Sequence, residues 1–255
     1  MQPSVSIVMP AFNSENSLPE AVESVLKQTF ESWELIIIDD GSTDSTFEIM
    51  KSLSNRDNRI KIHKNKNNIG VSETRNRAFK LSIGEWTAFL DSDDLWEPTK
   101  LEKQLALADQ KKAEFIFTGV TYIDENNASY DGLFNVPNRI TYKELRKQNV
   151  ISCSSVLVKS KYFKEIKMER DDMHEDYAVW LRILKSGIGA YGLDEPLLIY
   201  RISKDSKSGN KLKTIPMTYK VFRFIGYGPF KSFYFMSSHI VNSLTKYRKI
   251  YNKVS

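Results

Sequence analysis

Cysteine and histidine are scarce in this chain of 255 residues, which has one cysteine, Cys153, and three histidines. A single cysteine excludes an internal disulfide framework and a zinc site built on several cysteines, and three scattered histidines argue against a metal site built on imidazole. The first ten residues have no basic segment, and prolines interrupt their apolar run, so they do not resemble a signal peptide. Both observations predict a protein of the reducing cytoplasm.

Long hydrophobic runs are missing as well. The longest uncharged run near the C-terminus, 232–245, has 14 residues, whereas a membrane-spanning helix needs about 20. Hydrophobic residues still make up 41% of the chain, which is enough for the core of one large α/β domain. Because no internal repeat or low-complexity linker divides the chain, we expect one domain over residues 1–210 and a C-terminal tail over residues 211–255.

Acidic residues are absent after Asp205, and ten of the 37 basic residues lie beyond it. The tail is therefore strongly basic, which bears on its partners more than on the fold. Its basic residues are interleaved with aromatic ones, a pattern typical of segments that lie on an anionic membrane surface. A terminal helix packed on the domain is the alternative. Nucleic-acid binding also fits a basic, aromatic segment, but no recognised module surrounds it, so no nucleic acid is expected as a partner.

A glycine-rich phosphate loop is the last feature that the chain lacks. Where dinucleotide-binding and P-loop proteins carry such a loop, after the first predicted strand, this chain has the sequence Met-Pro-Ala-Phe-Asn at residues 9–13. This difference excludes the commonest nucleotide-binding motifs. Carboxylates remain as the groups that could carry chemistry.

Short apolar runs alternate with segments of helical periodicity through the first hundred residues or so. The runs predict strands over residues 5–9, 33–38, 60–63, 86–90, 115–122, 152–158 and 197–202. Helices are predicted over residues 17–28, 47–53, 70–84, 97–108 and 176–185. Ser17 and Glu20 are expected to form a capping box on the first helix, and Ser72 to cap the third. The alternation predicts an α/β fold with an open, mostly parallel, Rossmann-like sheet flanked by helices, which binds its ligands at the carboxyl ends of the strands.

Two acidic clusters follow predicted strands. Asp39 and Asp40 follow the second strand, and Asp91, Asp93 and Asp94 follow the strand that begins near Trp86. Carboxylates this close repel one another unless a cation neutralises them, so the second cluster suggests a site for a hard divalent ion with oxygen ligands. Aspartate is also an ordinary turn and cap residue, and for an isolated cluster that interpretation is favoured.

A third acidic pair, Glu175 and Asp176, stands at the start of the helix predicted over residues 176–185. One interpretation is catalytic. The alternative is structural, because the helix dipole favours acidic residues in the first turn of any helix.

Taken in order, these motifs resemble glycosyltransferase family 2, whose members are inverting enzymes of the GT-A fold. The resemblance rests on a strand followed by Pro-x-x-Asn, on Asp-Asp-Gly-Ser-Thr-Asp at 39–44, on Leu-Asp-Ser-Asp-Asp-Leu-Trp at 90–96, and on the Glu-Asp pair before Trp-Leu-Arg at 180–182. It covers residues 5 to about 210. Segments 94–98, 190–196 and 200–202 are most similar to enzymes of O-antigen, capsule and teichuronic acid assembly.

The resemblance implies roles in nucleotide binding for several residues. Asp40 matches the residue that accepts the uracil N3 proton. Pro10 and Asn13 belong to the same nucleotide-binding region, and Asp39 is expected to orient the neighbouring loop. Arg75 is expected to balance the charge of the diphosphate, with a surface ion pair as the alternative.

The resemblance also implies the metal ligands and the general base. Asp91 and Asp93 match the two acids of the family's Asp-x-Asp motif. Asp93 is expected to bind Mn²⁺ or Mg²⁺, which stabilises the departing UDP, and Asp91 to lie nearer the ribose or to bind the metal through water. Asp94 is expected to cap the turn into Leu95. Asp176 matches the general base, which takes the proton of the acceptor hydroxyl on the face of the sugar opposite UDP.

Processive members of the family carry a Gln-x-x-Arg-Trp motif and membrane-spanning helices, which this chain lacks, so one sugar should be added per acceptor. The resemblance favours metal-dependent transfer of glucose or galactose from a UDP-sugar to undecaprenyl-diphosphate-linked GlcNAc, on the inner face of the cell membrane, in O-antigen or capsule assembly. The alternatives are transfer of GlcNAc, GalNAc or rhamnose later in the same pathway, rhamnose from a dTDP donor, and a non-catalytic carbohydrate-binding or scaffold protein on the same fold.

Overall fold

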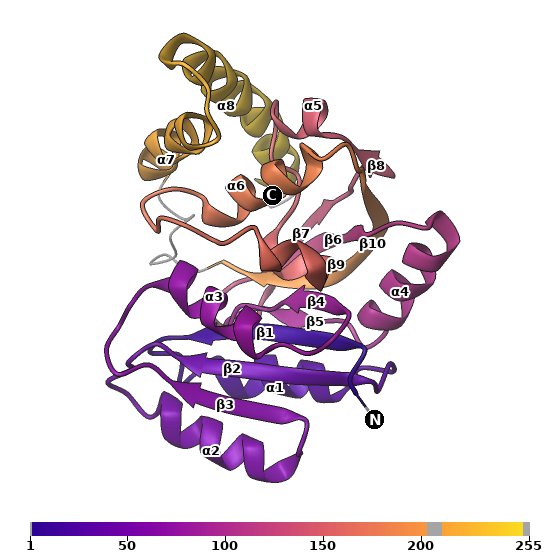
Figure 1. The fold of residues 1–255 in the computed structure, drawn as a ribbon, viewed down its shortest axis with the longest axis vertical. Helices are drawn as coiled ribbons and strands as arrows, with labels where there is room; N and C mark the ends of the chain where they lie inside the picture. Colours follow the sequence, from indigo (N-terminus) through magenta and orange to yellow (C-terminus); the bar gives the residue numbers. More distant parts are fainter. Residues whose placement is uncertain (1, 203–210, 252–255) are drawn as a thin grey trace.

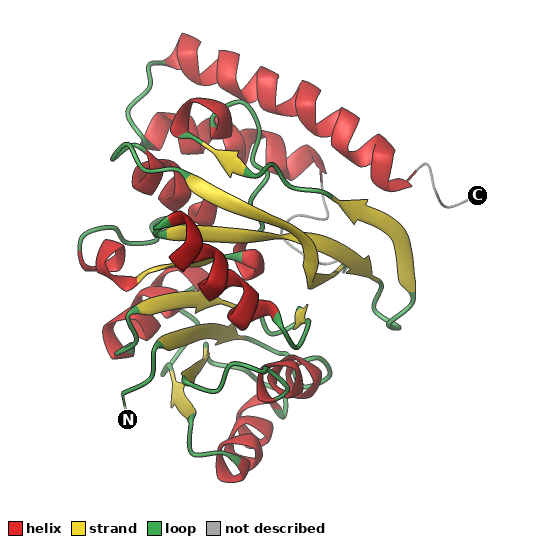
Figure 2. Ribbon diagram, turned by 90° about the vertical axis from the view of Figure 1, so that its right-hand side faces the viewer, coloured by secondary structure: helices red, strands yellow, loops and turns green. Residues whose placement is uncertain are grey.

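One sheet of ten strands runs through the protein, with helices against both of its faces (Figures 1 and 2). The computed structural model describes residues 2–202 and 211–251. The predicted α/β fold is confirmed. The boundary expected at residue 210 lies outside the described residues.

The first half of the sheet is parallel. Strand β1 (Val5–Ala11) pairs with β2 (Trp33–Asp39) on one side and with β4 (Trp86–Phe89) on the other, and β3 (Ile60–Lys64) lies beyond β2. All seven residues of β2 are buried, as expected for a parallel strand that is covered on both faces. The carboxyl ends of these four strands therefore meet at one edge of the sheet.

The second half of the sheet is mixed. The short strand β9 (Leu157–Lys159) is antiparallel to both β4 and β6 (Phe115–Ile123), and β6 is parallel to β10 (Ala190–Arg201). Three further strands add antiparallel pairs, namely β5 (Leu95–Trp96), β7 (Ser129–Phe134) and β8 (Arg139–Ile140). The order along the sheet is β3-β2-β1-β4-β9-β6-β10-β5, with β7 beside β6 and β8 beside β10.

The helices divide between the two faces of the sheet. Apolar residues of α1 (Leu18–Leu26), α2 (Thr46–Arg56) and α4 (Lys100–Lys111) join the core on one face. On the other face α3 (Val71–Leu81) packs on β1 and β2, while α6 (Glu175–Leu184) and the short α5 (Tyr142–Leu145) belong to a second core over β6 and β9.

Helix α6 is fixed by aromatic packing beneath it. The fully buried Trp180 makes edge-to-face contacts with Phe89 of β4 and Phe115 of β6, with ring centroids 5.3 Å and 5.2 Å apart. Aromatic pairs in this geometry add to the stabilisation that burial gives. The helix is thus held rigidly, with its first residues, Glu175 and Asp176, at a defined position relative to the sheet.

Several predicted local features differ in the structure. The predicted strand over 152–158 is instead a 3₁₀ turn (Cys153–Ser155) followed by β9. The predicted capping box on α1 is wrong, because Ser17 makes no side-chain cap and Glu20 instead pairs with Arg201 at 2.8 Å. The expected cap by Ser72 is also wrong, since Ser72 lies inside α3.

The C-terminal tail forms two helices that pack on the domain. These are α7 (Lys211–Phe224) and α8 (Pro229–Tyr251), and α8 runs along the end of the molecule opposite α2 (Figures 1 and 2). Val221 and Phe222 are completely buried in the second core beside α6. The Nη1 of Arg146 donates to the hydroxyl of Tyr227 at 2.6 Å. Within residues 2–202 and 211–251, no helix has the length and apolar character needed to cross a membrane.

Candidate active site

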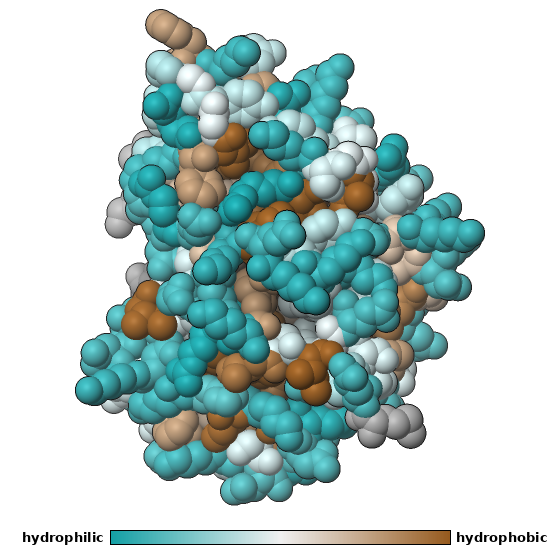
Figure 3. All heavy atoms as spheres, viewed as in Figure 1, coloured by the Kyte–Doolittle hydropathy of each residue, from teal (hydrophilic) through white to brown (hydrophobic). Residues whose placement is uncertain are grey.

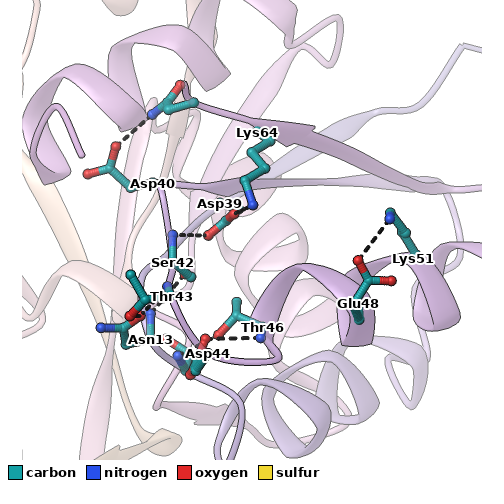
Figure 4. A network of polar contacts seen from close by, with 12 residues as sticks. Asn13, Asp39, Asp40, Ser42, Thr43, Asp44, Thr46, Glu48, Lys51 and Lys64 are labelled. Carbon is teal, nitrogen blue, oxygen red and sulfur yellow. Dashed lines mark hydrogen bonds and ion pairs between the residues drawn. The ribbon is translucent and has the colours of Figure 1, made fainter. Parts of the chain in front are cut away.

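Three loops at the carboxyl ends of β1, β2 and β4 are joined by hydrogen bonds, of which Figure 4 shows those between the first two loops. Asn13, which follows β1 in the left-handed region at φ 49°, donates its backbone N–H to Ser42 Oγ at 2.9 Å and accepts the N–H of Thr43 at 2.9 Å. The hydroxyls of Ser14 and Ser92 lie 2.8 Å apart and connect the first loop to the third. The loops expected to bind the nucleotide and the metal are therefore adjacent.

Asp39 is buried beneath the second loop. Its Oδ1 accepts the N–H of Ser42 at 3.0 Å, and Lys64 Nζ lies 3.3 Å from its Oδ2 (Figure 4). These contacts fit the expectation that Asp39 orients the loop. Pro10, expected in the nucleotide-binding region, is the penultimate residue of β1, pairs in register with Ile38, and is half-buried.

Asp40 is only 4% exposed, and three donors hold its carboxylate. Asn65 Nδ2 and the N–H of Ile69 donate to Oδ1 at 2.7 Å and 3.0 Å, and the N–H of Gly70 donates to Oδ2 at 2.9 Å. A carboxylate offers about four acceptor positions, so one position on Oδ2 remains for a further donor. Gly41 shapes this turn at φ +77°, where an added Cβ would lie 2.8 Å from the backbone nitrogen of Asn68.

The turn from Asp91 to Asp94 is held from two sides. Ser154 Oγ accepts the backbone N–H of Asp91 at 3.1 Å. From β10, Arg201 donates its backbone N–H to Asp94 Oδ1 at 3.1 Å and its Nε to the carbonyl oxygen of Asp93 at 2.9 Å. Asp94 is therefore a buried acceptor for the end of β10, which replaces the expected role of capping the turn into Leu95.

Two of the three carboxylates of this turn, those of Asp93 and Asp94, are short of positive charge. Burial and then repulsion by Asp91 raise the pKa of Asp93 to about 6, and burial followed by the charges of Asp93 and Asp91 raises the pKa of Asp94 well above its ordinary value. A bound cation would relieve this repulsion. No group of three or more His, Cys, Asp or Glu residues able to hold a metal occurs within the described part of the chain. The carboxylates of this turn fit a site of another kind, in which one or two carboxylates hold the ion and the phosphates of the substrate supply further ligands.

Arg75 joins the second and third acidic clusters. It lies on α3, is 3% exposed, and pairs through Nη2 with Asp91 and through Nη1 with Glu175 at 2.8 Å. The alternative of a surface ion pair is therefore wrong, because both ion pairs are buried or half-buried. Through Arg75, the Asp91 turn and the start of α6 lie against one another.

Asp176 is half-buried at the start of α6, next to the anchored Glu175, and its Oδ1 accepts the backbone N–H of Tyr177 at 2.7 Å. Cys153 is half-buried between the same elements. Burial raises the pKa of its thiol well above the ordinary value, and the charges of Arg75, Asp91 and Asp176 act on it as well. The structure thus brings Asp91 and Asp176, which are 85 positions apart in the sequence, to one side of the sheet edge.

The sequence did not single out Arg201, Ser154 or Asn65 for the site. Arg201 is 7% exposed, and besides the Asp93 turn its guanidinium contacts Glu20 and Asn127 at 2.8 Å and 2.6 Å. In the sequence it appeared only within the segment 200–202, which carried part of the family resemblance. A lone arginine at a strand end has no pattern of its own, so its role is visible only once β10 is placed beside the turn.

Comparison with known proteins gives relatives that span nearly the whole chain. A putative teichuronic acid biosynthesis glycosyltransferase, TuaG of Bacillus subtilis, is 36% identical over 87% of this chain and 88% of its own length. The Escherichia coli protein WfgD, named as a UDP-Glc:alpha-D-GlcNAc-diphosphoundecaprenol beta-1,3-glucosyltransferase, is 36% identical over 95% of this chain and 94% of its own length. WfaP of Escherichia coli carries the same description and is 35% identical over 95% of both chains.

Solved structures share the fold. The structure of Staphylococcus aureus TarS 1–349 in complex with UDP-GlcNAc superposes with a TM-score of 0.73 at 19% identity and covers 94% of this chain and 72% of that one. The mannosyltransferase PcManGT of Pyrobaculum calidifontis, in complex with GDP-Man and Mn²⁺, gives a TM-score of 0.71 at 14% identity over 93% and 69% of the two chains. One of these neighbours is described with a bound UDP-sugar and the other as a mannosyltransferase, and the fold of this chain is the GT-A fold that the resemblance implied. The family model described as glycosyl transferase family 2 matches residues 6–166, and the chain belongs to this family.

Proposed function

We propose that this protein is a metal-dependent, inverting glycosyltransferase that moves one hexose, glucose or galactose, from a UDP-sugar to undecaprenyl-diphosphate-linked GlcNAc or a short saccharide on the same lipid. One observation carries the proposal. Arg75 holds Asp91 of the β4 turn and Glu175, the neighbour of Asp176, against each other. A group for the donor's diphosphate and a group for the acceptor hydroxyl would then lie close to each other.

The nucleotide would bind over the loops after β1 and β2. Asp40 has one acceptor position left on Oδ2 and is otherwise held by three donors, so it can accept the N3–H of uracil without moving. Cytosine has no proton on that nitrogen. Pro10 and Asn13 would line the same region, with Asn13 locked by Ser42 and Thr43.

Asp93 and Asp91 would hold Mn²⁺ or Mg²⁺ together with the diphosphate, and the ion would stabilise the negative charge of the departing UDP. The raised pKa of Asp93, caused by burial and by the charge of Asp91, supports this assignment, because a bound cation would relieve the repulsion between the two carboxylates. The buried backbone of the turn, fixed by Ser154 and Arg201, would keep both acids in place for the ion. Arg75 already pairs with two carboxylates, so it would act on the diphosphate mainly through Asp91.

Asp176 would be the general base. In an inverting displacement the acceptor hydroxyl attacks the anomeric carbon from the face opposite UDP, so the base must stand across the sugar from the metal. Asp176 is half-buried at the start of α6, and the anchoring of Glu175 by Arg75 fixes the position of this helix start. The proton would pass from the acceptor oxygen to the Asp176 carboxylate as the new glycosidic bond forms.

The acceptor is proposed from the relatives. WfgD and WfaP are named for glucosyl transfer to GlcNAc-diphosphoundecaprenol, and they cover nearly the whole of this chain. A lipid-linked acceptor places the reaction at the inner face of the cell membrane, in the assembly of O-antigen, capsule or a related surface polysaccharide. The basic tail over residues 211–255 would bring the protein to that surface.

A donor screen tests the proposal. The purified protein is incubated with a synthetic lipid-diphosphate GlcNAc and, one at a time, with UDP-glucose, UDP-galactose, UDP-GlcNAc, UDP-GalNAc, dTDP-rhamnose and GDP-mannose, with Mn²⁺ or Mg²⁺ and with EDTA. Transfer of glucose or galactose with a β linkage in the NMR spectrum, lost in EDTA, is expected. Transfer of GlcNAc, GalNAc or rhamnose alone would favour the later step in the same pathway. UDP binding with no transfer from any donor would favour a non-catalytic protein.

A further inference from the structure

Helix α8 exposes an apolar stripe to solvent. Phe230, Phe233, Tyr234 and Val241 are 90%, 61%, 65% and 63% exposed. Tyr234 and Val241 lie about one and three turns after Phe230 along the helix, and Phe233 borders them, so all four share one face. Hydrophobic groups are visible at the end of the molecule that α7 and α8 form, on a face that is otherwise mostly hydrophilic (Figure 3).

The opposite side of α8 is packed on the protein. Ser232 is completely buried, and the ring of Phe235 stacks on Phe222 at 5.2 Å. Asn242 Nδ2 donates to the carbonyl oxygen of Lys147 at 3.1 Å. These contacts fix the orientation of α8 about its axis. The stripe faces outward because the opposite face of the helix packs on the protein.

We propose that the stripe formed by Phe230, Phe233, Tyr234 and Val241 inserts into the headgroup region of an anionic lipid membrane. Interfacial helices bury an aromatic and aliphatic face just below the headgroups and keep basic residues beside it. Phenylalanine and tyrosine suit this depth, since tyrosine can keep its hydroxyl in the wet headgroup layer. The stripe covers about 16 Å of helix at 1.5 Å per residue, which is long enough for α8 to lie in the plane of the membrane.

The charge around the stripe selects the lipid. Lys231 lies within the stripe's first turn and Arg223 stands at the end of α7, and both are exposed. The sequence has no acidic residue after Asp205. Basic residues beside an apolar face are attracted by the negative surface potential of anionic lipids. A second copy of this chain is a poorer partner, because α7 and α8 contain no acidic residue, so a contact between two copies through the stripe would bring basic helices together without an opposite charge.

The position of the stripe agrees with the proposed reaction. Membrane binding benefits the protein if its acceptor is lipid-linked, so this step rests on the proposed function. Helices α7 and α8 pack on the half of the molecule that carries α6 (Figure 1), and α6 begins with the proposed base. A membrane against α8 would therefore lie next to the half of the protein that carries Asp176.

Vesicle co-sedimentation of the full chain tests the inference. The variant F230S/F233S is compared with the wild type on vesicles of phosphatidylglycerol and phosphatidylcholine. The matched control is L81S/I83S, which removes two hydrophobic side chains that are 38% and 54% exposed on and after α3. We expect the partition coefficient of F230S/F233S to fall at least about tenfold, and that of the control to stay within about twofold of the wild type. K231E should weaken binding to the anionic vesicles and leave the weak binding to pure phosphatidylcholine unchanged.

Two results would overturn the inference. One is that F230S/F233S pellets with anionic vesicles as fully as the wild type. The other is a wild-type dimer in analytical ultracentrifugation that F230S/F233S converts to a monomer, which would assign the stripe to a second copy. Transfer to a short-chain, water-soluble acceptor separates this inference from the proposed function. With that acceptor, F230S/F233S should keep the wild-type rate of transfer. A wild-type protein that is inactive with every donor would refute the proposed function but would leave the vesicle result unchanged.

Discussion

Arg75 and Glu175 form a buried ion pair, with Nη1 2.8 Å from Oε1, that ties helix α3 to the first residue of α6. The same guanidinium pairs with Asp91 at the end of β4. Its positive charge is thus shared by two acids that stand on either side of the proposed reaction centre. Removing the arginine should therefore affect the stability of the fold and the geometry of the site together.

Replacing Arg75 by Met should lower the free energy of unfolding by about 3–5 kcal/mol, because it leaves Glu175 buried and without its cation. Urea unfolding at pH 7 measures this. The matched control is R56M, which breaks the half-exposed pair of Arg56 with Glu23 and should cost less than about 1 kcal/mol. Equal losses in the two variants would show that the Arg75 pairs contribute no more than a surface pair. The double variant R75M/E175Q should recover part of the loss.

The parallel half of the sheet could be predicted because most of its strands are short, mainly apolar runs, of which β2 is the clearest. The antiparallel strand β9 and the turn before it were harder to predict. Ser155 Oγ donates to the carbonyl oxygen of Ser152 at 2.6 Å, and this local bond turns Cys153–Ser155 into a 3₁₀ turn where hydrophobic pattern suggested a strand. The start of β10 was missed because Gly192 and Pro196, with two acids between them, break the pattern, and the register with β6 shifts there.

The tail was expected as a unit apart from the domain, and that division can be tested with two phenylalanines. Phe222 is completely buried against Tyr177 and Phe235, whereas Phe230 is 90% exposed. F222A should lower the free energy of unfolding by about 3–5 kcal/mol, because it leaves a cavity in the second core, and F230A should change it by less than about 0.5 kcal/mol. A single unfolding transition with a lowered midpoint in F222A would mean that α7 unfolds with the domain. A separate early transition would instead mark an independent tail.

The acids of the site could be predicted from the sequence because each stands directly after a strand or at the start of a helix. The residues that hold these acids in place could not be predicted. Arg201 meets Asp94 across 107 positions, and Arg75 meets Glu175 across 100. Such pairs depend on which strands are neighbours, and one sequence does not contain that information. A capping box was predicted at Ser17, where Glu20 turns instead to Arg201, and the box that does form, at Thr141 and Glu144, was not predicted.

Replacing Asp176 by Asn should lower the rate of sugar transfer by about 10²–10⁴-fold, since an amide cannot take the acceptor proton. UDP and Mn²⁺ binding, measured by calorimetry, should persist because the proposed base would contact the acceptor and not the nucleotide or the metal. D172N is the matched control, an exposed acid four positions earlier that pairs with Arg170, and it should keep the wild-type rate. Unchanged turnover in D176N would refute the assignment of the base.

Replacing Arg201 by Met should raise the concentration of metal needed for half-maximal transfer by about tenfold or more. The variant removes the hydrogen bond to the carbonyl oxygen of Asp93 and the contacts of Arg201 with the exposed Glu20 and Asn127. The turn must then be ordered when the ion binds. The metal activation curve at saturating UDP-sugar measures this. E20Q, which weakens only one of the contacts of Arg201, should shift the curve less. A lower maximal rate with an unshifted curve in R201M would contradict a positioning role at the metal.

Lys100 gives a prediction about stability and pH. It is completely buried, its Nζ lies 2.9 Å from Gln104 Oε1 and 3.8 Å from the centre of the Trp96 ring, and burial lowers its pKa well below the ordinary value. In the unfolded chain the same lysine titrates near 10.4. Between the two pKa values the unfolded state binds more protons, so the free energy of unfolding of the wild type should rise with pH up to about 10.4.

The variant K100M removes this titration. Its free energy of unfolding, minus that of the wild type, should therefore decrease steadily between pH 7 and pH 10 in urea titrations. The slope is the informative quantity, because the loss of the Gln104 contact adds a cost that does not change with pH. K111M, at an exposed lysine in the last turn of the same helix α4, should give a flat difference. Parallel curves for K100M and the wild type would mean that Lys100 keeps an ordinary pKa in the folded protein, with water or an anion reaching its ammonium group.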